Sequence, residues 1–254
     1  MDTSDTSAPP PGERAAEIAA ALAAVRLRLA EACAAAGRAP DEVALLPVTK
    51  FFPESDVRIL YALGCREFGE SRDQEASAKV AEFGRDMGDG ARDVHWHMIG
   101  RLQRNKARSV AGWAHTIHSV DSARLASALD RASAEAFDAG RRRAPLRVLL
   151  QVSLDDDPGR GGVPIGDLES LGESIESARG LALAGLMAVP PLGSDSDAEF
   201  ARLEDIHSRF VASFPGATEL SAGMTGDLEA AVRHGSTCVR VGTAILGRRP
   251  IIST

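Results

Sequence analysis

The sequence predicts an α/β fold, a single (β/α)8 barrel of the TIM type that carries an extra helix at its N-terminus. Eight short apolar segments alternate with helical segments, which is the pattern of parallel strands joined by helices. The chain has 254 residues, a length typical of one such barrel. No Gly-x-Gly-x-x-Gly motif follows the first apolar segment, so an open nucleotide-binding sheet is the weaker alternative. No linker-like stretch interrupts the alternation, and we expect residues 13–254 to form one barrel domain.

The composition limits the classes of function and the compartment. Hydrophobic residues make up 44% of the chain and charged residues 26%, as in a globular protein with an ample core. The net charge of −7 argues against a nucleic-acid partner, because a broad nucleic-acid surface needs clustered positive charge. Cys33, Cys65 and Cys238 are far apart and form no Cys-x-x-Cys pair, which indicates reduced thiols in a reducing compartment.

The N-terminal region predicts a tail followed by a helix. Residues 1–12 are polar and proline-rich and lack the basic and apolar parts of a signal peptide, so we expect a disordered tail. Residues 13–36 place Ile18, Leu22, Val25 and Leu29 at helical spacing. The charged residues of this helix exclude a membrane span. The sequence therefore predicts a cytoplasmic protein without membrane contact. We expect a monomer, because no long exposed apolar surface is apparent.

The strands and helices of the barrel follow in order. The first strand is expected in residues 43–50, where a run of aliphatic residues is typical of a strand buried in a parallel sheet. The later strands are expected at residues 66–71, 95–100, 116–121, 147–153, 181–189, 219–223 and 238–242. Helices are expected at residues 55–63, 73–83, 102–110, 197–214 and 227–234, with two more behind the fourth and fifth strands.

The first expected strand ends at a lysine, Lys50, in the segment VALLPVTKFFP, residues 43–53. Lysine is rare in this chain, which has only Lys50, Lys79 and Lys106. A lysine at the end of a buried strand is costly unless it is paired or chemically used. Desolvation there would lower its pKa and leave an amine able to attack a carbonyl group. A lysine that simply reaches solvent is the alternative on position alone.

The carboxyl ends of the strands form the active site in a barrel of this type. The residues expected there are Lys50, Glu70, Ser71, Ile99, Gly100, Asp121, Ser153, Met187, residues 221–223, Arg240, Gly242 and Thr243. The glycines after the seventh and eighth strands fall where such barrels commonly bind phosphate, since glycine lets the backbone approach an anion closely. A phosphate corner with a reactive lysine predicts a phosphorylated carbonyl compound held as a Schiff base. Either a phosphosugar aldolase or a protein that holds pyridoxal 5′-phosphate fits.

Several segments together carry a resemblance to a known family. They are VTKFFP, FGES, HWHMIGRLQRNK, IHSVDS, GLMAVPP, LSAGMTGDLEAAV and VRVGTAILG. In this order they resemble the pyridoxal phosphate homeostasis family, once called proline-synthetase co-transcribed proteins. The resemblance covers most of the chain, residues 43–247. It implies a barrel similar to the N-terminal domain of alanine racemase, without the second domain of the racemase.

The resemblance implies pyridoxal 5′-phosphate as the cofactor and assigns roles at the barrel mouth. Lys50 matches the lysine that forms a Schiff base with the cofactor, and Arg240 matches the arginine that faces the pyridine nitrogen. Ser71 departs from the family, which more commonly has asparagine there, so a polar contact near the cofactor would be weaker. The residues expected to hold the phosphate are Ser221, Gly242 and Thr243. The full expected cofactor-binding set is Lys50, Ser71, Met187, Ser221, Arg240, Gly242 and Thr243.

The implied function is pyridoxal phosphate homeostasis, in which the protein holds the cofactor without substantial turnover and supplies client enzymes or buffers its free level. The chemistry of the residues agrees, because an arginine opposite the ring nitrogen disfavours ring protonation and leaves a poorer electron sink. Racemisation would also need a second acid–base group, usually a tyrosine. The one tyrosine, Tyr61, lies in the expected helix behind the first strand. We expect a non-catalytic carrier, with a phosphosugar lyase or aldolase and an amino-acid racemase as alternatives.

The histidines and one basic segment leave open questions. His95 and His97 share a strand face and could suggest a metal pair, but no third ligand is placed by the sequence, so we expect a packed or hydrogen-bonded pair and no metal. His115 and His118 are expected to be structural. Gln103, Asn105 and Lys106 have two equally supported roles: they cap the third barrel helix, or they line the mouth of the barrel.

Overall fold

The computed structural model describes residues 11–155, 157 and 159–248. Of the expected N-terminal tail, residues 1–10 lie outside the described residues. Pro11 and Gly12 already belong to helix α1, Pro11–Ala35, so this helix begins two residues earlier than expected. Proline is favoured in a first helical turn, because its missing N–H would have no helical partner there.

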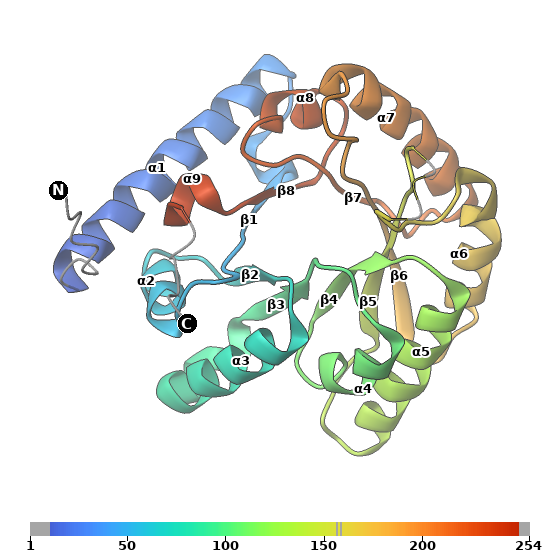
Figure 1. The fold of residues 1–254 in the computed structure, drawn as a ribbon, viewed down its shortest axis with the longest axis horizontal. Coiled ribbons are helices and arrows are strands. Elements are labelled where there is room, and N and C mark those ends of the chain that lie inside the picture. The colour runs from blue at the N-terminus through green and yellow to red at the C-terminus, as the bar shows by residue number, and fades with distance from the viewer. Residues whose placement is uncertain (1–10, 156, 158, 249–254) are drawn as a thin grey trace, which may run out of the picture.

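The eight strands form one parallel sheet that curls into a nearly closed barrel (Figure 1). They are β1 Ala44–Pro47, β2 Glu67–Glu70, β3 His95–Met98, β4 Thr116–Val120, β5 Leu146–Gln151, β6 Leu181–Met187, β7 Glu219–Ser221 and β8 Cys238–Val241. Each strand pairs with its neighbour in sequence from β2 to β8, and β8 pairs with β1. Between β1 and β2 the contact is a single parallel bridge from Val48 to Gly69, where the Thr49 N–H donates to the Gly69 carbonyl at 2.9 Å. The predicted eight-stranded α/β barrel is confirmed.

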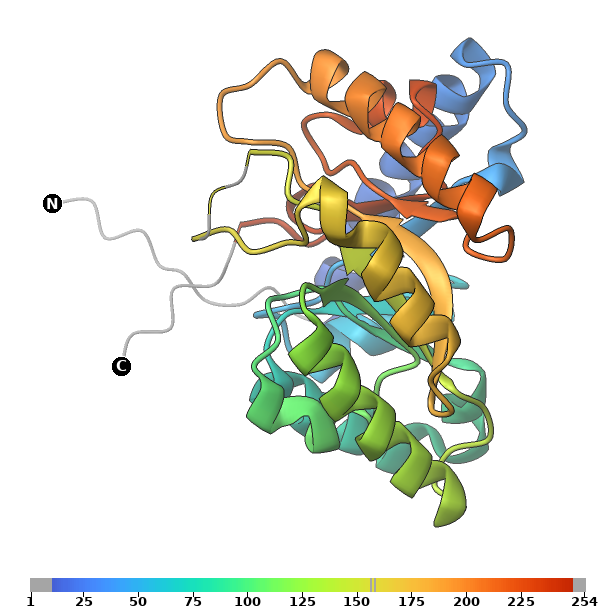
Figure 2. The same cartoon turned by 90° about the vertical axis from the view of Figure 1, so that its right-hand side faces the viewer.

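Helices cover the outside of the barrel, as Figure 2 shows for the side that carries α5, α6 and α7. Their bounds are α2 Glu54–Ala62, α3 Asp73–Met87, α4 Ala107–Val110, α5 Ala123–Asp138, α6 Leu168–Glu176, α7 Ser196–Ser213, α8 Leu228–Arg233 and α9 Thr243–Leu246. The apolar core lies between these helices and the outer face of the sheet. The helix expected at residues 102–110 is shorter, since only α4 is α-helical and Arg104–Lys106 form a 3-10 turn. None of the helices in the described ranges is long and apolar enough to cross a membrane.

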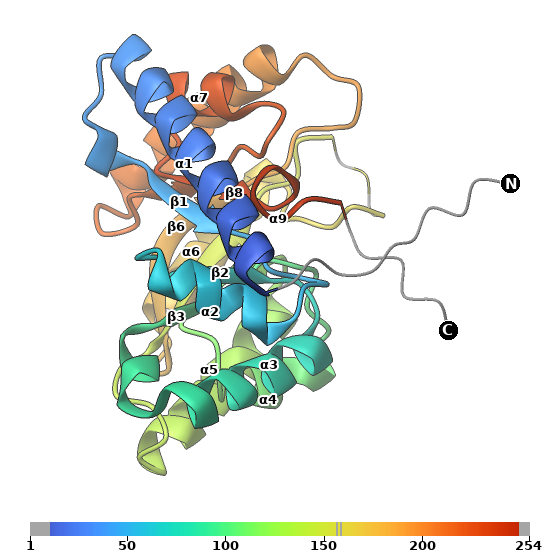
Figure 3. The same cartoon turned by 90° about the vertical axis from the view of Figure 1, so that its left-hand side faces the viewer.

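Helix α1 takes the place of a long helix after β8. The helix that follows β8, α9, has four residues, and α1 lies across the outside of β1 and β8 (Figure 3). The predicted stripe Ile18, Leu22, Val25 and Leu29 is buried against this region, in one cluster with side chains of β8, α8 and α9. The extra N-terminal helix therefore closes the core where the last barrel helix is short.

The interior of the barrel is partly polar. Arg147 on β5 pairs with Glu219 on β7, and His118 on β4 contacts Ser221 on β7. These strands are not neighbours in the sheet, so their side chains can meet only across the interior. Most barrels of this class fill the interior with branched apolar residues. His118 and Ser221 are buried, and buried polar groups need partners, so this departure points to a functional use of the interior.

Candidate functional site

The strand ends that carry Lys50 and Gly242 lie side by side at one end of the barrel. Leu46 on β1 is in register with Arg240 on β8, and the Val48 N–H donates to the Val241 carbonyl at 2.9 Å. A Cβ atom on Gly242 would lie 3.2 Å from the Val48 carbonyl oxygen, so the backbones approach closely here. The residues that follow both strands therefore emerge at the same corner of the mouth.

Lys50 is not on the strand itself. Strand β1 ends at Pro47, and Lys50 lies three residues later in a turn, where it is half-buried. The expectation of a lysine at the end of a buried strand is therefore corrected. The strand ends early because the chain leaves the β8 ladder after Val48 and turns toward β2 through the Val48–Gly69 bridge. The Nζ atom of Lys50 lies 5.9 Å from the centre of the Phe51 ring.

Arg240 is a buried cation whose partners are all neutral. Its side chain projects into the barrel from β8 and is 5% exposed. Nη1 donates to the Ser221 carbonyl at 2.7 Å and to Ser221 Oγ at 2.6 Å, and Nη2 donates to the Ala188 carbonyl at 2.9 Å. Among the described residues no carboxylate forms an ion pair with Arg240. Burial lowers its pKa, as expected for a desolvated charge. Such a site favours a ligand that brings negative charge or a strong hydrogen-bond acceptor.

A row of hydrogen bonds runs from Arg240 down through the barrel. His118 Nδ1 lies 2.9 Å from Ser221 Oγ, and His118 Nε2 lies 2.9 Å from His97 Nδ1. Arg240 can only donate hydrogen bonds, so Ser221 Oγ accepts one from it. The Ser221 hydroxyl can then donate its own hydrogen bond to His118 Nδ1. His118 then donates from Nε2 to His97. The Nε2–H of His97 points toward the other end of the barrel, 3.9 Å from Glu67 Oε2. The alternative direction would turn an unprotonated His97 Nε2 toward that carboxylate, which is unfavourable.

The histidines in this row are neutral. Burial, reinforced by His115 and His95, lowers the pKa of His97 to about 3. Burial and the neighbouring His97 and Arg240 lower the pKa of His118 well below its usual value. An imidazolium at either position would be desolvated beside another cation. Two neutral imidazoles can therefore accept and donate in series, and they hold the Ser221 hydroxyl against Arg240.

The histidines pair differently from the expectation. His95 stacks on His115 with 3.9 Å between ring centres, while His97 bonds to His118. His95 and His97 were expected to pair with each other. Instead, each β3 histidine pairs with a histidine on β4 or just before it. In the described parts of the chain, no three His, Cys, Asp or Glu side chains are grouped so as to hold a metal ion. Sequence reasoning missed the contact of His118 with Ser221; an inward-facing histidine on the strand after His97 was the available signal.

The other expected site residues lie at or near the same end of the barrel. Met187 ends β6 and is buried with Leu149 and Ala184 in a small cluster of their own. Ser71 directly follows β2, where its backbone packs so closely on Gly100 that a Cβ there would lie 2.2 Å from the Ser71 carbonyl oxygen. Thr243 is exposed and opens α9 after β8. Lys106 is drawn toward α3, with Nζ 3.8 Å from Asp73 Oδ2.

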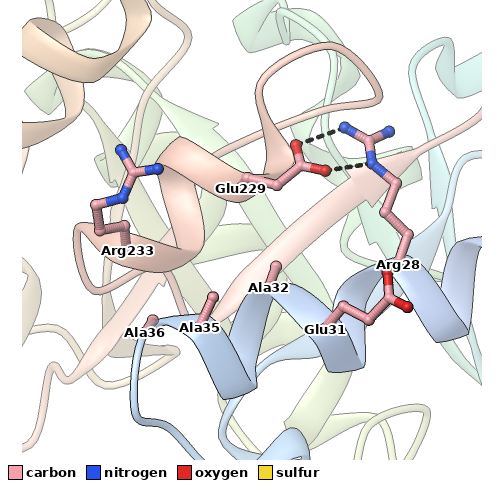
Figure 4. A pocket seen from close by; sticks show the side chains of 7 residues that line it. All are labelled: Arg28, Glu31, Ala32, Ala35, Ala36, Glu229 and Arg233. Atoms are coloured by element: carbon pink, nitrogen blue, oxygen red, sulfur yellow. Dashed lines mark hydrogen bonds and ion pairs between the residues drawn. The ribbon is translucent and has the colours of Figure 1, made fainter.

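The mouth also carries a cavity of about 460 Å³ over the ends of β3, β4 and β5. Arg101, Asp121 and Ser153 contribute to its lining. This cavity lies across the mouth from the corner formed by β1 and β8. A second hollow, of about 250 Å³, lies on the outside between α1 and α8 (Figure 4). It is a less suitable site, because two of its charged side chains already pair with each other: Arg28 holds Glu229 through bonds of 2.5 and 2.6 Å.

Tyr61 lies away from the mouth. It belongs to α2, its ring is covered by the Arg66 guanidinium at 3.9 Å, and its hydroxyl faces Asp93 at 3.5 Å. Arg66 and Asp93 precede β2 and β3, so they mark the opposite end of the barrel. The chain has no other tyrosine. No tyrosine hydroxyl is therefore available beside Lys50.

Comparisons with known proteins agree with this fold. The family profile described as "Alanine racemase, N-terminal domain" matches residues 20–250. A protein of Mycobacterium bovis called "Pyridoxal phosphate homeostasis protein" is 55% identical, over 98% of each chain. One of the same name from Escherichia coli is 36% identical, over 92% of this chain and 97% of the relative.

The structure of PipY from Synechococcus elongatus with pyridoxal phosphate bound is 36% identical with a TM-score of 0.76, over 91% of this chain and 100% of PipY. An alanine racemase from Corynebacterium glutamicum, 16% identical with a TM-score of 0.64 over 94% of this chain and 62% of the racemase, shares the fold. The chain belongs to the pyridoxal phosphate homeostasis protein family.

Proposed function

We propose that the protein binds pyridoxal 5′-phosphate at the corner of the mouth between β1 and β8, and serves in intracellular homeostasis of this cofactor. The observation that carries the proposal is Arg240, a buried cation with neutral partners, at the same end of the barrel as the turn of Lys50. A ligand with an anionic tail and an aromatic nitrogen would add the negative charge that the neutral partners of Arg240 do not provide. The names of the relatives and the bound PipY structure support the same ligand.

The residues at this corner divide the binding task. Lys50 would hold the cofactor covalently as a Schiff base, and Arg240 would face the ring nitrogen. Ser221, Gly242 and Thr243 would hold the phosphate, where Gly242 leaves room for close backbone approach. Ser71 and Met187 would border the ring. When bound to an enzyme, pyridoxal phosphate serves as an electron sink for carbanions.

The same residues limit turnover. A permanently cationic Arg240 disfavours a proton on the ring nitrogen, which weakens the electron sink. The acid–base tyrosine that a racemase needs has no counterpart at the mouth, since Tyr61 lies at the other end of the barrel. We therefore propose a monomeric, non-catalytic carrier that takes up pyridoxal phosphate and releases it to enzymes that depend on it. A location in the cytoplasm is part of this proposal.

Reduction with borohydride tests the covalent step. The protein is loaded with pyridoxal 5′-phosphate, reduced and digested, and mass spectrometry locates the pyridoxyl group. We expect it on Lys50 and not on Lys106, with loss of the visible absorbance on reduction. The Lys50→Ala variant should yield no pyridoxyl peptide while still binding the ligand reversibly, because the phosphate contacts remain. A wild-type protein that stays colourless after loading, or an adduct confined to another lysine, contradicts the proposal.

A further inference from the structure

The turn that carries Lys50 is held in a strained conformation. Phe51, the next residue, has a φ of 70°, and in the described parts of the chain it is the one residue other than glycine with a positive φ. For a residue with a Cβ atom this conformation is unfavourable. It persists only if the surroundings fix the backbone. A device that fixes this turn also fixes the position from which the Lys50 side chain starts.

The backbone is anchored on both sides of Lys50. After it, the Phe51 N–H donates to Glu75 Oε1 at 2.5 Å. Before it, the Thr49 N–H donates to the Gly69 carbonyl at 2.9 Å. The Thr49 carbonyl, which belongs to the peptide bond joining Thr49 to Lys50, accepts from Lys79 Nζ at 2.8 Å. Two of these anchors come from α3, so this helix sets the geometry of the turn.

Lys79 is the centre of the anchoring group. It is 6% exposed, and its Nζ contacts the Thr49 carbonyl at 2.8 Å, Glu70 Oε1 at 2.6 Å and Glu75 Oε1 at 3.4 Å. These contacts match the three donors of an ammonium group. Glu70 is fully buried and also accepts from Thr49 Oγ1 at 2.7 Å. Burial raises the pKa of Glu70, and Lys79 opposes this rise.

A buried ion pair of this kind is a weak device for stability alone, because apolar side chains of similar size often serve at least as well. Its value lies in fixing geometry. Here the pair bonds to the peptide group on one side of Lys50 and, through Glu75, to the amide on the other. Replacing the pair by apolar side chains would keep the volume but remove the bond to the Thr49 carbonyl, and Glu75 would lose the ammonium group that holds it beside the Phe51 amide.

We propose that Lys79, with Glu70 and Glu75, is a positioning residue that holds the Lys50 amine in the orientation needed to capture an aldehyde. This rests on the proposed function for the identity of the ligand. Lys79 is not in contact with the ligand and acts through the Thr49–Phe51 turn. Its loss should weaken the covalent step and leave reversible binding by the phosphate and ring intact.

Two ligands separate these effects. Pyridoxal 5′-phosphate carries the aldehyde, and pyridoxine 5′-phosphate has the same ring and phosphate with an alcohol in its place. The test variant is Lys79→Met combined with Glu70→Gln, because Lys79→Met alone would leave the Glu70 charge buried without its partner. We expect affinity for pyridoxal phosphate to fall about tenfold, as for a displaced reactive group, with less than about a twofold change for pyridoxine phosphate.

Arg142→Met is the matched control. Arg142 is also a partly buried cation that donates to backbone carbonyls, those of Ala111 at 2.9 Å and Ala114 at 2.7 Å. These carbonyls precede β4, on another part of the barrel. The control variant should lose stability without changing the ratio of the two affinities. Equal losses for the two ligands in the Lys79→Met and Glu70→Gln variant would overturn the proposal and leave a structural role.

A second readout needs no ligand. The unliganded protein is labelled with a trace of acetic anhydride, and the acetylation of Lys50 is measured relative to that of Lys106, whose side chain is 46% exposed. Freeing the turn should expose the half-buried Lys50 amine, so the Lys50 to Lys106 ratio should rise in the double variant and stay constant in Arg142→Met. An unchanged ratio in the double variant overturns the proposal. A wild-type protein that gives no borohydride adduct defeats the proposed function instead, and the labelling ratio still decides whether Lys79 positions Lys50.

Discussion

On acidification the unliganded protein is expected to lose a large part of its stability between pH 6.5 and pH 4. Each histidine that stays neutral in the folded chain and takes up a proton in the unfolded chain lowers the free energy of unfolding by about 1.4 kcal/mol per pH unit below 6.5. His97, with a pKa of about 3, and His118, whose pKa burial lowers well below its usual value, both do so. Over two pH units His97 alone removes roughly 2–3 kcal/mol, a large share of the stability of a typical domain, and His118 acts in the same direction.

The sign follows from the direction of the shifts. A histidine with a depressed folded pKa binds fewer protons folded than unfolded, so stability rises with pH from the folded pKa up to about 6.5 and is complete above it. The lowered pKa values of Glu42 and Glu229 act in the same direction, but only at more acidic pH. The raised pKa values of Glu54 and Glu70 act in the opposite direction and offset part of the loss.

Urea denaturation at a series of pH values measures the slope, and His97→Gln identifies its source. Glutamine can keep a hydrogen bond to His118 but does not titrate, so the slope between pH 6 and 4.5 should fall by about 1.4 kcal/mol per pH unit. The double variant with His118→Gln should have a smaller slope still. The slope that remains comes from the half-buried His115, whose pKa burial and His95 lower to about 4, and from His207, whose pKa burial also lowers. A slope that both variants leave unchanged would show that other groups cause the acid sensitivity.

The barrel could be predicted because its signals are local. Ile18, Leu22, Val25 and Leu29 recur at helical spacing, and each strand is a short apolar run between helices. The common location of Lys50 and Arg240 was also predictable, because parallel strands of a barrel bring their carboxyl ends to one face. Periodicity and topology are sufficient for this level of description.

The hydrogen-bonded interior could not be predicted in the same way. Alternation shows that His118 and Ser221 face inward, but they lie 103 positions apart, and their contact depends on barrel curvature and strand register. The anchor of Lys50 was missed for a similar reason. In the sequence, Lys79 is one charged residue among several on an amphipathic helix. Its contacts with Glu70 and the Thr49 carbonyl depend on how α3 packs against β2.

Replacing Arg240 by methionine is expected to weaken pyridoxal phosphate binding by about 100-fold. The ligand would lose its hydrogen bond to a buried cation, which is worth about 1.5–3 kcal/mol, and the Ser221 hydroxyl would lose the partner that orients it. The stability of the unliganded protein should change far less. Removing a desolvated charge is favourable, and this offsets the cost of leaving the carbonyls of Ser221 and Ala188 without a donor.

Ligand titration and thermal unfolding of the same samples measure the two effects, and Arg240→Lys is the matched control. Lysine keeps the charge but cannot span Ser221 and Ala188 with a planar fork, so affinity should recover only in part. If Arg240 faces the ring nitrogen as proposed, its loss would also remove the cation that disfavours ring protonation, and the spectrum of the bound ligand should become pH-dependent in Arg240→Met. Wild-type affinity together with an unchanged spectrum in that variant would mean that Arg240 serves the barrel interior alone. The ligand would then have to bind elsewhere on the mouth, where the cavity beside Arg101 and Asp121 is the next place to test.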